Sequence, residues 1–242
     1  MPVVRLAARG DGVTAAGTFV AGAVPGDRVQ ADGAIIAGPD HAEPVCQHFH
    51  LCGGCQMQHV SERLLRQFAR DRVVEPLERA GIRPQQIMPV HMSPPASRRR
   101  VAMRATRTDG EVRLGFNMEG QHRIVDLAEC PAMHPELFAL VAPLRQLLAP
   151  YLAERSAIGV TLALTASGPD LLLVNLQANQ VPVIEGLAQF ARTHGLARLS
   201  VEGAMGVETV VVNADPQVVF GAVPVTLPPA AFLQATQDGE QA

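Results

Sequence analysis

The stretch CQHFHLCGGCQMQH, residues 46–59, carries three of the four cysteines of this 242-residue chain. Two glycines separate Cys52 from Cys55, and glycine lets the backbone fold back so that several thiols and amide groups face one point. The fourth cysteine, Cys130, lies 75 positions after Cys55 in the sequence Glu-Cys-Pro. We expect Cys46, Cys52, Cys55 and Cys130 to bind one inorganic centre, which would fix the N-terminal loop to the middle of the chain.

Three kinds of cysteine site are compatible with this spacing. Three ligands in one loop and one remote ligand are typical of a [4Fe-4S] cluster. Structural zinc sites usually draw on two close pairs of ligands, and His48, His50 and His59 lie nearby without fitting such a spacing well. Buried free thiols are the third alternative, whereas disulfides do not suit a chain of this size in a reducing compartment. The spacing favours the cluster.

Residues 1–40 consist of short apolar stretches separated by the turn sequences GDG at 10–12 and PGD at 25–27. Such a pattern predicts a small β-barrel or meander. A segment of this length buries too little surface to be stable alone, so it must pack on residues later in the chain. Residues 41–96 contain the cysteine loop and then a helix, for which Ser61 is the expected N-cap.

Residues 97–225 contain helices and hairpins in blocks, which predicts an α+β domain. A three-stranded antiparallel meander is expected between residues 101 and 127, with arginines on its open face. Further elements are expected as a helix at 134–152, a hairpin of 158–164 with 171–176, a helix at 183–194, and a hairpin of 207–213 with 217–220.

Residues 226–242 look like the beginning of a further structural unit. The sequence LPPAAFLQAT at 227–236 is followed by only a few residues with helical character. A helix of that length is not stable on its own. We therefore expect the chain to be a fragment of a longer protein.

The overall composition is that of a folded protein without a membrane span. Apolar residues make up 48% of the chain, which excludes a disordered or fibrous protein. No run of 18 or more apolar residues is present, and the N-terminus has no export signal. We expect a cytoplasmic protein.

Charge is distributed unevenly along the chain. All 20 basic residues are arginines, and the net charge is −3, but residues 60–125 carry a net charge of +6 and the remainder −9. This indicates a face suited to an anionic partner, with an ordinary solvated strand edge as the alternative. Guanidinium groups match phosphate oxygens in shape, so we select as phosphate contacts the arginines in and beside the meander. They are Arg98, Arg99, Arg100, Arg104 and Arg107.

Several short motifs occur together in a fixed order. They are GDGV at 10–13, VPGD at 24–27, the cysteine block at 46–59, RRR at 98–100, LGF at 114–116, CP at 130–131 and FLQ at 232–234. In these motifs the chain resembles the RNA uracil-5-methyltransferases, specifically the iron–sulfur branch that methylates 23S ribosomal RNA. The resemblance implies a short OB-like β-barrel of the TRAM type, a central α+β domain with a [4Fe-4S] cluster, and a Rossmann-like methyltransferase domain that is missing from this chain.

The resemblance also implies roles for individual residues. Cys130 matches the fourth cluster ligand and not the nucleophilic cysteine of the family. Gln234 matches a glutamine that contacts S-adenosylmethionine, and Phe232 matches the aromatic residue beside it. Because the family's nucleophile and general base lie in the missing domain, we expect the full protein to be a methyltransferase and this fragment to be inactive. The implied partner is 23S ribosomal RNA, and we expect a monomer.

Two positions depart from the family pattern. Only 18 residues separate Asp27 from Cys46, where the family has further strands, and Thr236 stands where an asparagine is common. We therefore expect the barrel to bind RNA more weakly than in the family, and the polar contact of that asparagine in the catalytic pocket to be altered. Two other functions stay open: a cluster- or zinc-bearing RNA-binding module without activity, and a transfer RNA uracil-5-methyltransferase.

Overall fold

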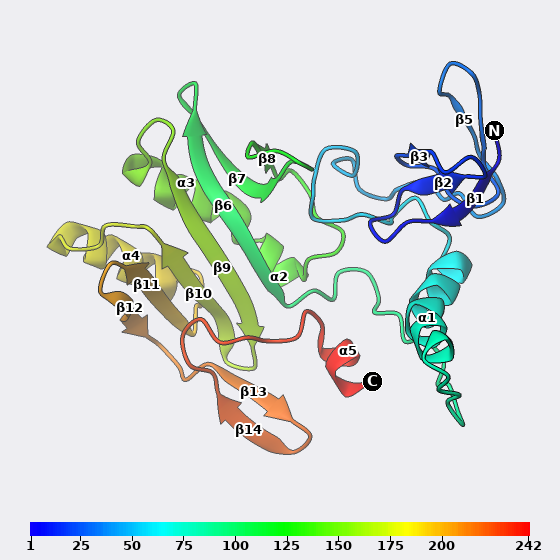
Figure 1. Ribbon diagram of the computed structural model, residues 1–242. Coiled ribbons are helices and arrows are strands. Elements are labelled where there is room, and N and C mark those ends of the chain that lie inside the picture. The colour runs from blue at the N-terminus through cyan, green and yellow to red at the C-terminus, as the bar shows by residue number, and fades with distance from the viewer. The chain divides into compact units, whose positions relative to one another are not determined.

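The computed structural model describes residues 1–242, which divide into two compact units. Unit 1 comprises residues 1–50 and 55–92, and unit 2 comprises residues 51–54 and 93–242. Figure 1 shows the elements of both units. The cysteine loop is therefore shared, because residues 51–54 pack with unit 2 while the residues on either side of them belong to unit 1.

Unit 1 begins with short strands around a small apolar core. The strands are β1 (Val3–Leu6), β2 (Gly12–Thr14), β3 (Phe19–Val20), β4 (Arg28–Val29) and β5 (Ile35–Ile36). β1, β2 and β3 form an antiparallel sheet, and β4 pairs with β5. Val3, Ala23 and Val29 are buried together between these strands. The predicted short strands are thus confirmed, whereas a barrel of the TRAM type stays a prediction.

A fully buried carboxylate, that of Asp27, organises the turns of unit 1. Its Oδ2 accepts hydrogen bonds from the amide of Val24 and from Nδ1 of His41, both at 2.8 Å, and its Oδ1 accepts one from the amide of Gly38 at 2.7 Å. A buried carboxylate requires such donors, because it has lost its hydration. The VPGD motif therefore has a structural role in this chain.

The helix of unit 1, α1 (Glu62–Arg79), begins where the sequence predicts. Oγ of Ser61 accepts a hydrogen bond from the amide of Leu64 at 3.2 Å, as an N-cap residue should. The helix is followed by Gly81, which has a φ of 75° and continues the chain in a conformation that glycine tolerates. Val74 is the one buried residue of α1.

Unit 2 contains a seven-stranded sheet in the order β12-β11-β10-β9-β6-β7-β8. The strands are β6 (Arg100–Thr108), β7 (Glu111–Asn117), β8 (Ile124–Asp126), β9 (Ala157–Thr165), β10 (Gly168–Val174), β11 (Arg198–Gly203) and β12 (Gly206–Val212). Neighbouring strands are antiparallel, except that β10 and β11 are parallel. The predicted meander corresponds to β6, β7 and β8, and the first predicted hairpin to β9 and β10.

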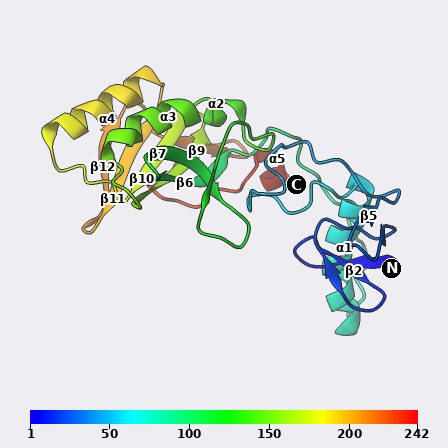
Figure 2. The same cartoon turned by 90° about the horizontal axis from the view of Figure 1, so that it is seen from above.

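The helices that lie between β8 and β11 in the chain cover one face of this sheet (Figure 2). They are α2 (Pro135–Phe138), α3 (Val141–Leu148), the 3-10 turn η1 (Ala149–Tyr151) and α4 (Val181–Thr193). Alternate residues of β6, namely Val101, Met103 and Ala105, point into the core that the helices close. The other residues of β6, including Arg104, face away from it, as the period of a strand requires.

Part of the opposite face is covered by the C-terminal segment. The hairpin of β13 (Gln217–Phe220) and β14 (Val223–Thr226) and the helix α5 (Gln237–Gln241) belong to it. Val218, Leu227 and Leu233 of this segment form a second apolar cluster with Ala163 of β9. The arginine-bearing part of the face, around Arg104, lies outside this cluster.

Two elements differ from their predictions. The single helix expected at 134–152 is divided into α2, α3 and η1, since Pro143 has no amide hydrogen for a helical bond and is accommodated in the first turn of a new helix. The hairpin expected from 207–213 and 217–220 is wrong, because β12 pairs with β11 and β13 pairs with β14. β11 did not emerge from the sequence pattern, because its residues 198–201 are buried on both faces and do not alternate.

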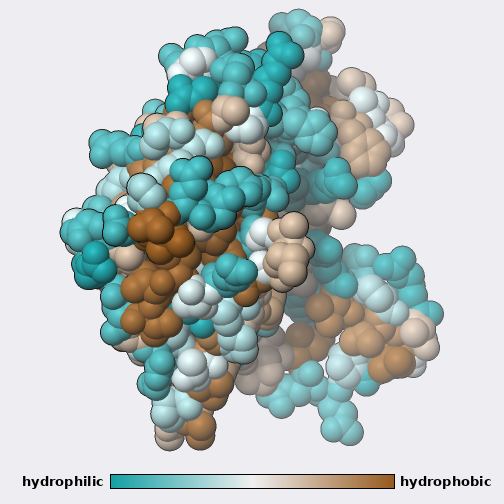
Figure 3. All heavy atoms as spheres, turned by 90° about the vertical axis from the view of Figure 1, so that its left-hand side faces the viewer, coloured by the Kyte–Doolittle hydropathy of each residue, from teal (hydrophilic) through white to brown (hydrophobic).

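The protein has no helix that combines the length and apolar character needed to cross a membrane. Viewed from the side of β12 and α4, the surface of unit 2 carries patches of apolar atoms (Figure 3). Exposed apolar side chains on these two elements are Val181, Ile184, Val207 and Val212. This edge of the sheet therefore differs in character from the arginine-bearing open face.

Candidate nucleic-acid interface and cysteine site

Cys52 is buried in unit 2, beside the turn that joins β7 to β8. The amide of Gly53 donates a hydrogen bond to the carbonyl of Asn117 at 2.9 Å, which holds the CGGC segment against this turn. The amide of Gly54 lies 3.4 Å from Sγ of Cys52 and donates to it. One thiol and one amide group therefore meet at Cys52, whereas the convergence of several thiols stays a prediction.

Both glycines of the CGGC sequence have neighbours that leave little room for a side chain. A Cβ atom at Gly53 would lie 3.1 Å from the carbonyl oxygen of Asn117. A Cβ atom at Gly54 would lie 3.3 Å from Sγ of Cys52 and 3.4 Å from the ring of Phe116. Glycine at these two positions therefore allows the close approach of the segment to β7.

Cys130 is half-buried in unit 2 and packs against the main apolar core. Its carbonyl accepts a hydrogen bond from the amide of Met133 at 3.1 Å. The carbonyl of the next residue, Pro131, accepts one from the amide of Ala96 at 2.7 Å. The Cys130 loop is therefore fixed to the chain that leads into β6.

Cys46 and Cys55 are half-buried and belong to unit 1. The amide of Cys46 donates to Oε1 of Gln58 at 3.2 Å, and its carbonyl accepts a hydrogen bond from the amide of Phe49 at 3.0 Å. Within neither unit are three or more His, Cys, Asp or Glu side chains arranged to hold a metal ion. Each unit holds two of the four cysteines, and a joint site of all four stays a prediction.

His59, at the end of the cysteine block, is a core residue of unit 1. Its Nε2 lies 3.1 Å from the carbonyl oxygen of Gly10, to which the neutral ring donates, and its Nδ1 has no hydrogen-bond partner. The ring packs against that of Phe49 at a centroid distance of 5.5 Å. Burial lowers the pKa of His59 because the charged ring would lose its hydration, although the Gly10 carbonyl acts in the opposite direction.

Arg99, one of the predicted phosphate contacts, is buried and already engaged. Its guanidinium forms an ion pair with Glu240 of α5 and lies 3.4 Å from the carbonyl oxygen of Gln234. Its amide donates to the carbonyl of Ala235 at 2.8 Å. Arg99 therefore anchors the C-terminal segment and is not free to contact RNA.

Arg107, another of the predicted contacts, donates to three carbonyl oxygens. Its Nε donates to Leu152 at 2.8 Å, its Nη1 to Gly110 at 2.9 Å and its Nη2 to Ala149 at 2.6 Å. Carbonyl groups at the end of a helix lack intrahelical partners and attract cations. Arg107 thus joins the end of η1 to the turn between β6 and β7.

Arg98 and Arg100 lie near the beginning of β6 and differ in their surroundings. The side chain of Arg98 is exposed. The guanidinium of Arg100 lies over the ring of Phe232, with 5.6 Å between its carbon and the ring centroid. The structure therefore does not bring the five predicted arginines together into one site.

Arg104 lines a basic cavity of about 560 Å³ on unit 2, and here the structure does assemble a group of arginines. β6, β7, the turn before β8 and the loop before β9 supply its lining. Five arginines take part, and no aspartate or glutamate does; the arginines are Arg104, Arg107, Arg113, Arg123 and Arg155. We call this cavity the arginine pocket.

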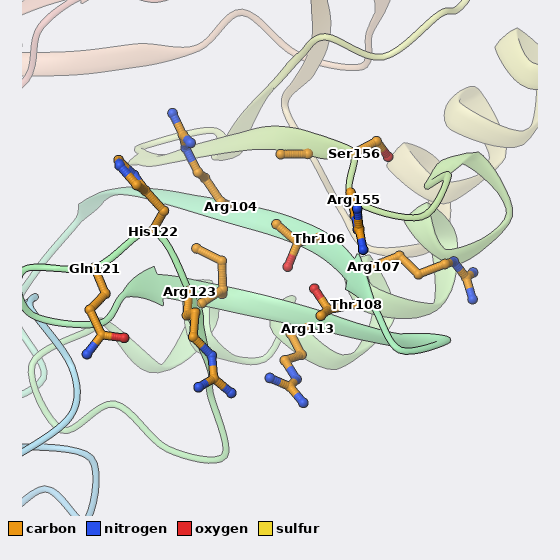
Figure 4. A pocket seen from close by; sticks show the side chains of 12 residues that line it. Arg104, Thr106, Arg107, Thr108, Arg113, Gln121, His122, Arg123, Arg155 and Ser156 are labelled. Carbon is orange, nitrogen blue, oxygen red and sulfur yellow. The ribbon is translucent and has the colours of Figure 1, made fainter.

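Figure 4 shows how these side chains are arranged. Thr106 and Thr108 lie in the middle, Arg104 on one side, and Arg113 and Arg123 on the other. Arg113 also approaches Glu111 at 3.3 Å. The meander with arginines on its open face was predicted, but Arg113, Arg123 and Arg155 were not among the predicted contacts. Arg113 lies within β7, whereas Arg123 and Arg155 lie outside the strands, where strand alternation does not define the direction of a side chain.

The residues of the FLQ motif alternate in exposure. Leu233 is buried in the second apolar cluster, whereas Phe232, with 72% of its surface exposed, and Gln234 face solvent. An alternating segment held by one buried residue presents its two neighbours outward. Their assignment to S-adenosylmethionine stays a prediction.

The chain is thus an α+β protein with a cavity lined by arginines. Comparison with proteins of similar sequence indicates more closely which kind of protein it is. No family model matches the chain. The chain is 42% identical over 239 residues to an uncharacterized RNA methyltransferase of Zymomonas mobilis, and 34% identical over 256 residues to one of Rhizobium meliloti. These alignments cover 99% and 98% of the chain, and 60% of each relative.

A relative with a more specific name is the 23S rRNA (uracil(1939)-C(5))-methyltransferase RlmD of Halomonas elongata. It is 34% identical over 194 residues, which are 74% of this chain and 40% of the relative. The chain therefore spans about 60% or less of the length of these curated relatives. It is related to proteins named RNA methyltransferases along almost its whole length.

Proposed function

We propose that the chain is the RNA-binding part of an S-adenosylmethionine-dependent methyltransferase that modifies carbon 5 of a uridine in 23S ribosomal RNA. The similarity to the Halomonas elongata enzyme over 74% of the chain carries this proposal. The arginine pocket supports it, because a cavity lined by arginines without a carboxylate attracts a polyanion.

In this proposal residues 1–242 bind the RNA, and other parts of the full-length protein carry out the methyl transfer. S-adenosylmethionine, when bound, supplies the methyl group, and Phe232 and Gln234 are the residues of this chain that would contact it. Both side chains are exposed, so they are accessible to a ligand. We assign no catalytic residue within residues 1–242 and expect them to bind RNA without transferring a methyl group.

We also propose that Cys46, Cys52, Cys55 and Cys130 together hold a [4Fe-4S] cluster with a structural role. Four thiols are a suitable donor set, and the amide that donates to Sγ of Cys52 is the kind of hydrogen bond that sulfur ligands of such clusters receive. The four thiols would stabilise the cysteine loop, and no electron transfer is required for the methylation.

The methylation is tested by mapping 5-methyluridine in 23S ribosomal RNA and transfer RNA from cells that lack the full-length gene. We expect loss of the modification at one site in 23S ribosomal RNA and its return on complementation. Loss in transfer RNA alone would replace the proposed substrate, and unchanged 5-methyluridine in both RNAs would overturn the proposed activity.

The metal centre is tested by measuring iron, sulfide and zinc in protein purified without oxygen. We expect four iron atoms per chain in a brown protein, and their loss in the Cys130→Ser variant. One zinc per chain in a colourless protein would establish the zinc alternative, and the absence of both metals would establish free thiols. If a stripped protein folds and binds RNA unchanged, the structural role is wrong.

A further inference from the structure

We propose that the arginine pocket binds the phosphodiester backbone of RNA through Arg104, Arg123 and Arg155, whereas Arg107 positions the loop that carries Arg155. This rests on the proposed RNA-binding function and specifies where on unit 2 the RNA is held. The group differs from the predicted contacts by including Arg123 and Arg155 and by giving Arg107 a structural role.

The three proposed contacts have guanidinium groups that no protein group neutralises. The side chains of Arg104, Arg123 and Arg155 form no hydrogen bond or ion pair in the structure, and no carboxylate lines the cavity around them. Cations that share a concave site repel one another unless an anion lies between them. The pocket is therefore complementary to a ligand with several negative charges.

The neutral residues of the pocket also favour phosphate over a base. Thr106 and Thr108 place hydroxyl groups between the arginines (Figure 4), and hydroxyl and guanidinium donors both suit phosphate oxygens. His122 is the one aromatic side chain that lines the cavity, so the series of aromatic rings typical of sequence-tolerant base binding is missing. The volume of about 560 Å³ is within the roughly 300–1,000 Å³ of pockets that take organic ligands and accommodates more than one phosphate group.

Arg155 is held over the pocket by a backbone conformation that is rare for arginine. Its φ is 62°, in the left-handed region, and its amide donates to the carbonyl of Arg107 at 3.0 Å. The adjacent Ser156 fixes the same loop, since its Oγ donates to the carbonyl of Ala153 at 2.7 Å. Such strain persists only where the surroundings impose it, and it clusters at functional sites.

Arg107 differs from these residues because its guanidinium is fully used inside the protein. Its three hydrogen bonds to carbonyl oxygens join the β6–β7 turn to the loop before β9. Replacing it should therefore lower stability, whereas replacing a free arginine should lower only RNA affinity. This separation of effects distinguishes a positioning residue from a phosphate contact.

The experiment measures binding of a fluorescein-labelled 12-nucleotide oligouridylate to the full chain by fluorescence anisotropy, between 50 and 200 mM KCl (roughly the range in which phosphate contacts dominate salt dependence). The variants are Arg104→Ala, Arg123→Ala and Arg155→Asn, since asparagine accepts a positive φ. Each should weaken binding about 3- to 10-fold and reduce the slope of log affinity against log salt by about 0.7. The same losses are expected with oligoadenylate.

Two controls make the result specific. Arg192→Ala removes an exposed arginine of α4, on the helix-covered face of the sheet, and should leave affinity and slope unchanged. Arg107→Ala should lower the urea midpoint, which the three contact variants should not change. If Arg107→Ala instead weakened binding at an unchanged urea midpoint, its positioning role would be wrong.

The outcomes separate this inference from the proposed function. If the wild-type chain binds oligouridylate and the Arg104, Arg123 and Arg155 variants bind it equally well with the same salt slope, the pocket is not the site, while RNA binding stands. If the wild-type chain binds no RNA at any of these salt concentrations, both the pocket and the RNA-binding function are overturned.

Discussion

Gly115 of β7 is a position at which a single methyl group would disturb the sheet. A Cβ atom there would lie 2.1 Å from the carbonyl oxygen of Val125 in β8 and 2.8 Å from Cγ of Leu127. Glycine is therefore required at this position of the LGF motif, because β8 approaches closely. The nearest atom of β8 belongs to its backbone, which cannot move aside as a flexible side chain can.

We predict that Gly115→Ala lowers the free energy of unfolding by about 2–3 kcal/mol, as overpacking of a rigid site does. Gly203→Ala is the matched control, since no atom lies within 4 Å of its added Cβ, and it should change stability by less than about 0.5 kcal/mol. Urea unfolding followed by circular dichroism measures both. Equal stabilities of the two variants would contradict the packing argument.

His59 predicts a dependence of stability on pH. Because burial lowers its pKa in the folded chain, the unfolded chain, with the ordinary pKa of 6.5, takes up a proton at higher pH. The contribution of the neutral His59 ring to the free energy of unfolding is therefore complete above about pH 6.5. It is lost progressively as the pH falls below this value.

We expect the urea midpoint of the wild type to fall between about pH 7 and pH 5 more steeply than that of His59→Gln, which has no titrating ring. The variant keeps an amide that can donate to the Gly10 carbonyl. The difference between the two midpoints isolates His59 from the other seven histidines. A difference that is constant over this pH range would exclude His59 as its source.

At the scale of elements, a buried ion pair joins the parallel strands β10 and β11. Nε and Nη2 of Arg198 donate to the two carboxylate oxygens of Asp170 at 3.0 and 2.7 Å. Nη1 of the same arginine donates to the carbonyl of Leu227 at 2.9 Å, which connects the C-terminal segment to the sheet. Both side chains are largely buried, so neither can be hydrated if the other is lost.

We predict that Asp170→Asn lowers the free energy of unfolding by about 3–5 kcal/mol, because it leaves the Arg198 cation buried without a counter-charge. Glu111→Gln, which breaks the more exposed pair with Arg113, should cost less than about 1 kcal/mol. Denaturant titration of the two variants gives the comparison. A loss at Asp170 no larger than that at Glu111 would show that the buried pair contributes little.

The sequence predicts elements well where a local signal defines them. Ser61 begins α1 as expected from its capping chemistry, and alternation in β6 and β7 gives the meander. It fails at β11, because this strand does not alternate, and so neither its parallel pairing with β10 nor its hairpin with β12 was expected. Local patterns contain no information on which of several apolar strands lie side by side.

The residues of the arginine pocket could likewise be predicted only in part from the sequence. The meander placed Arg104 on an open face, but Arg99 and Arg107 were selected from the same run of arginines and have internal partners. The loop positions of Arg123 and Arg155 depend on the folded sheet. Sequence therefore indicates the charge of the face, and the fold decides which cations remain available.

At the scale of the whole molecule, the fold brings two residues that are 141 positions apart in the sequence into one ion pair. Arg99, just before β6, pairs with Glu240 of α5, and the amide of Arg99 donates to the carbonyl of Ala235 at 2.8 Å. Ser93 and Thr236 add a hydroxyl–hydroxyl hydrogen bond of 2.8 Å. These contacts hold the C-terminal segment against the chain that leads into β6, and Arg99 is more buried than its partner Glu240.

We predict that Glu240→Gln releases this segment, because the Arg99 cation loses its counter-charge in a site from which water is largely excluded. Hydrogen–deuterium exchange should show the Arg99 amide exchanging at least about 10-fold faster in the variant, which corresponds to a loss of about 1.4 kcal/mol of local stability. The amides of Leu171 and Leu173, in the middle of β10, serve as internal references and should keep their wild-type rates. Unchanged exchange at Arg99 would mean that the Leu233 cluster, and not the ion pair, anchors the segment.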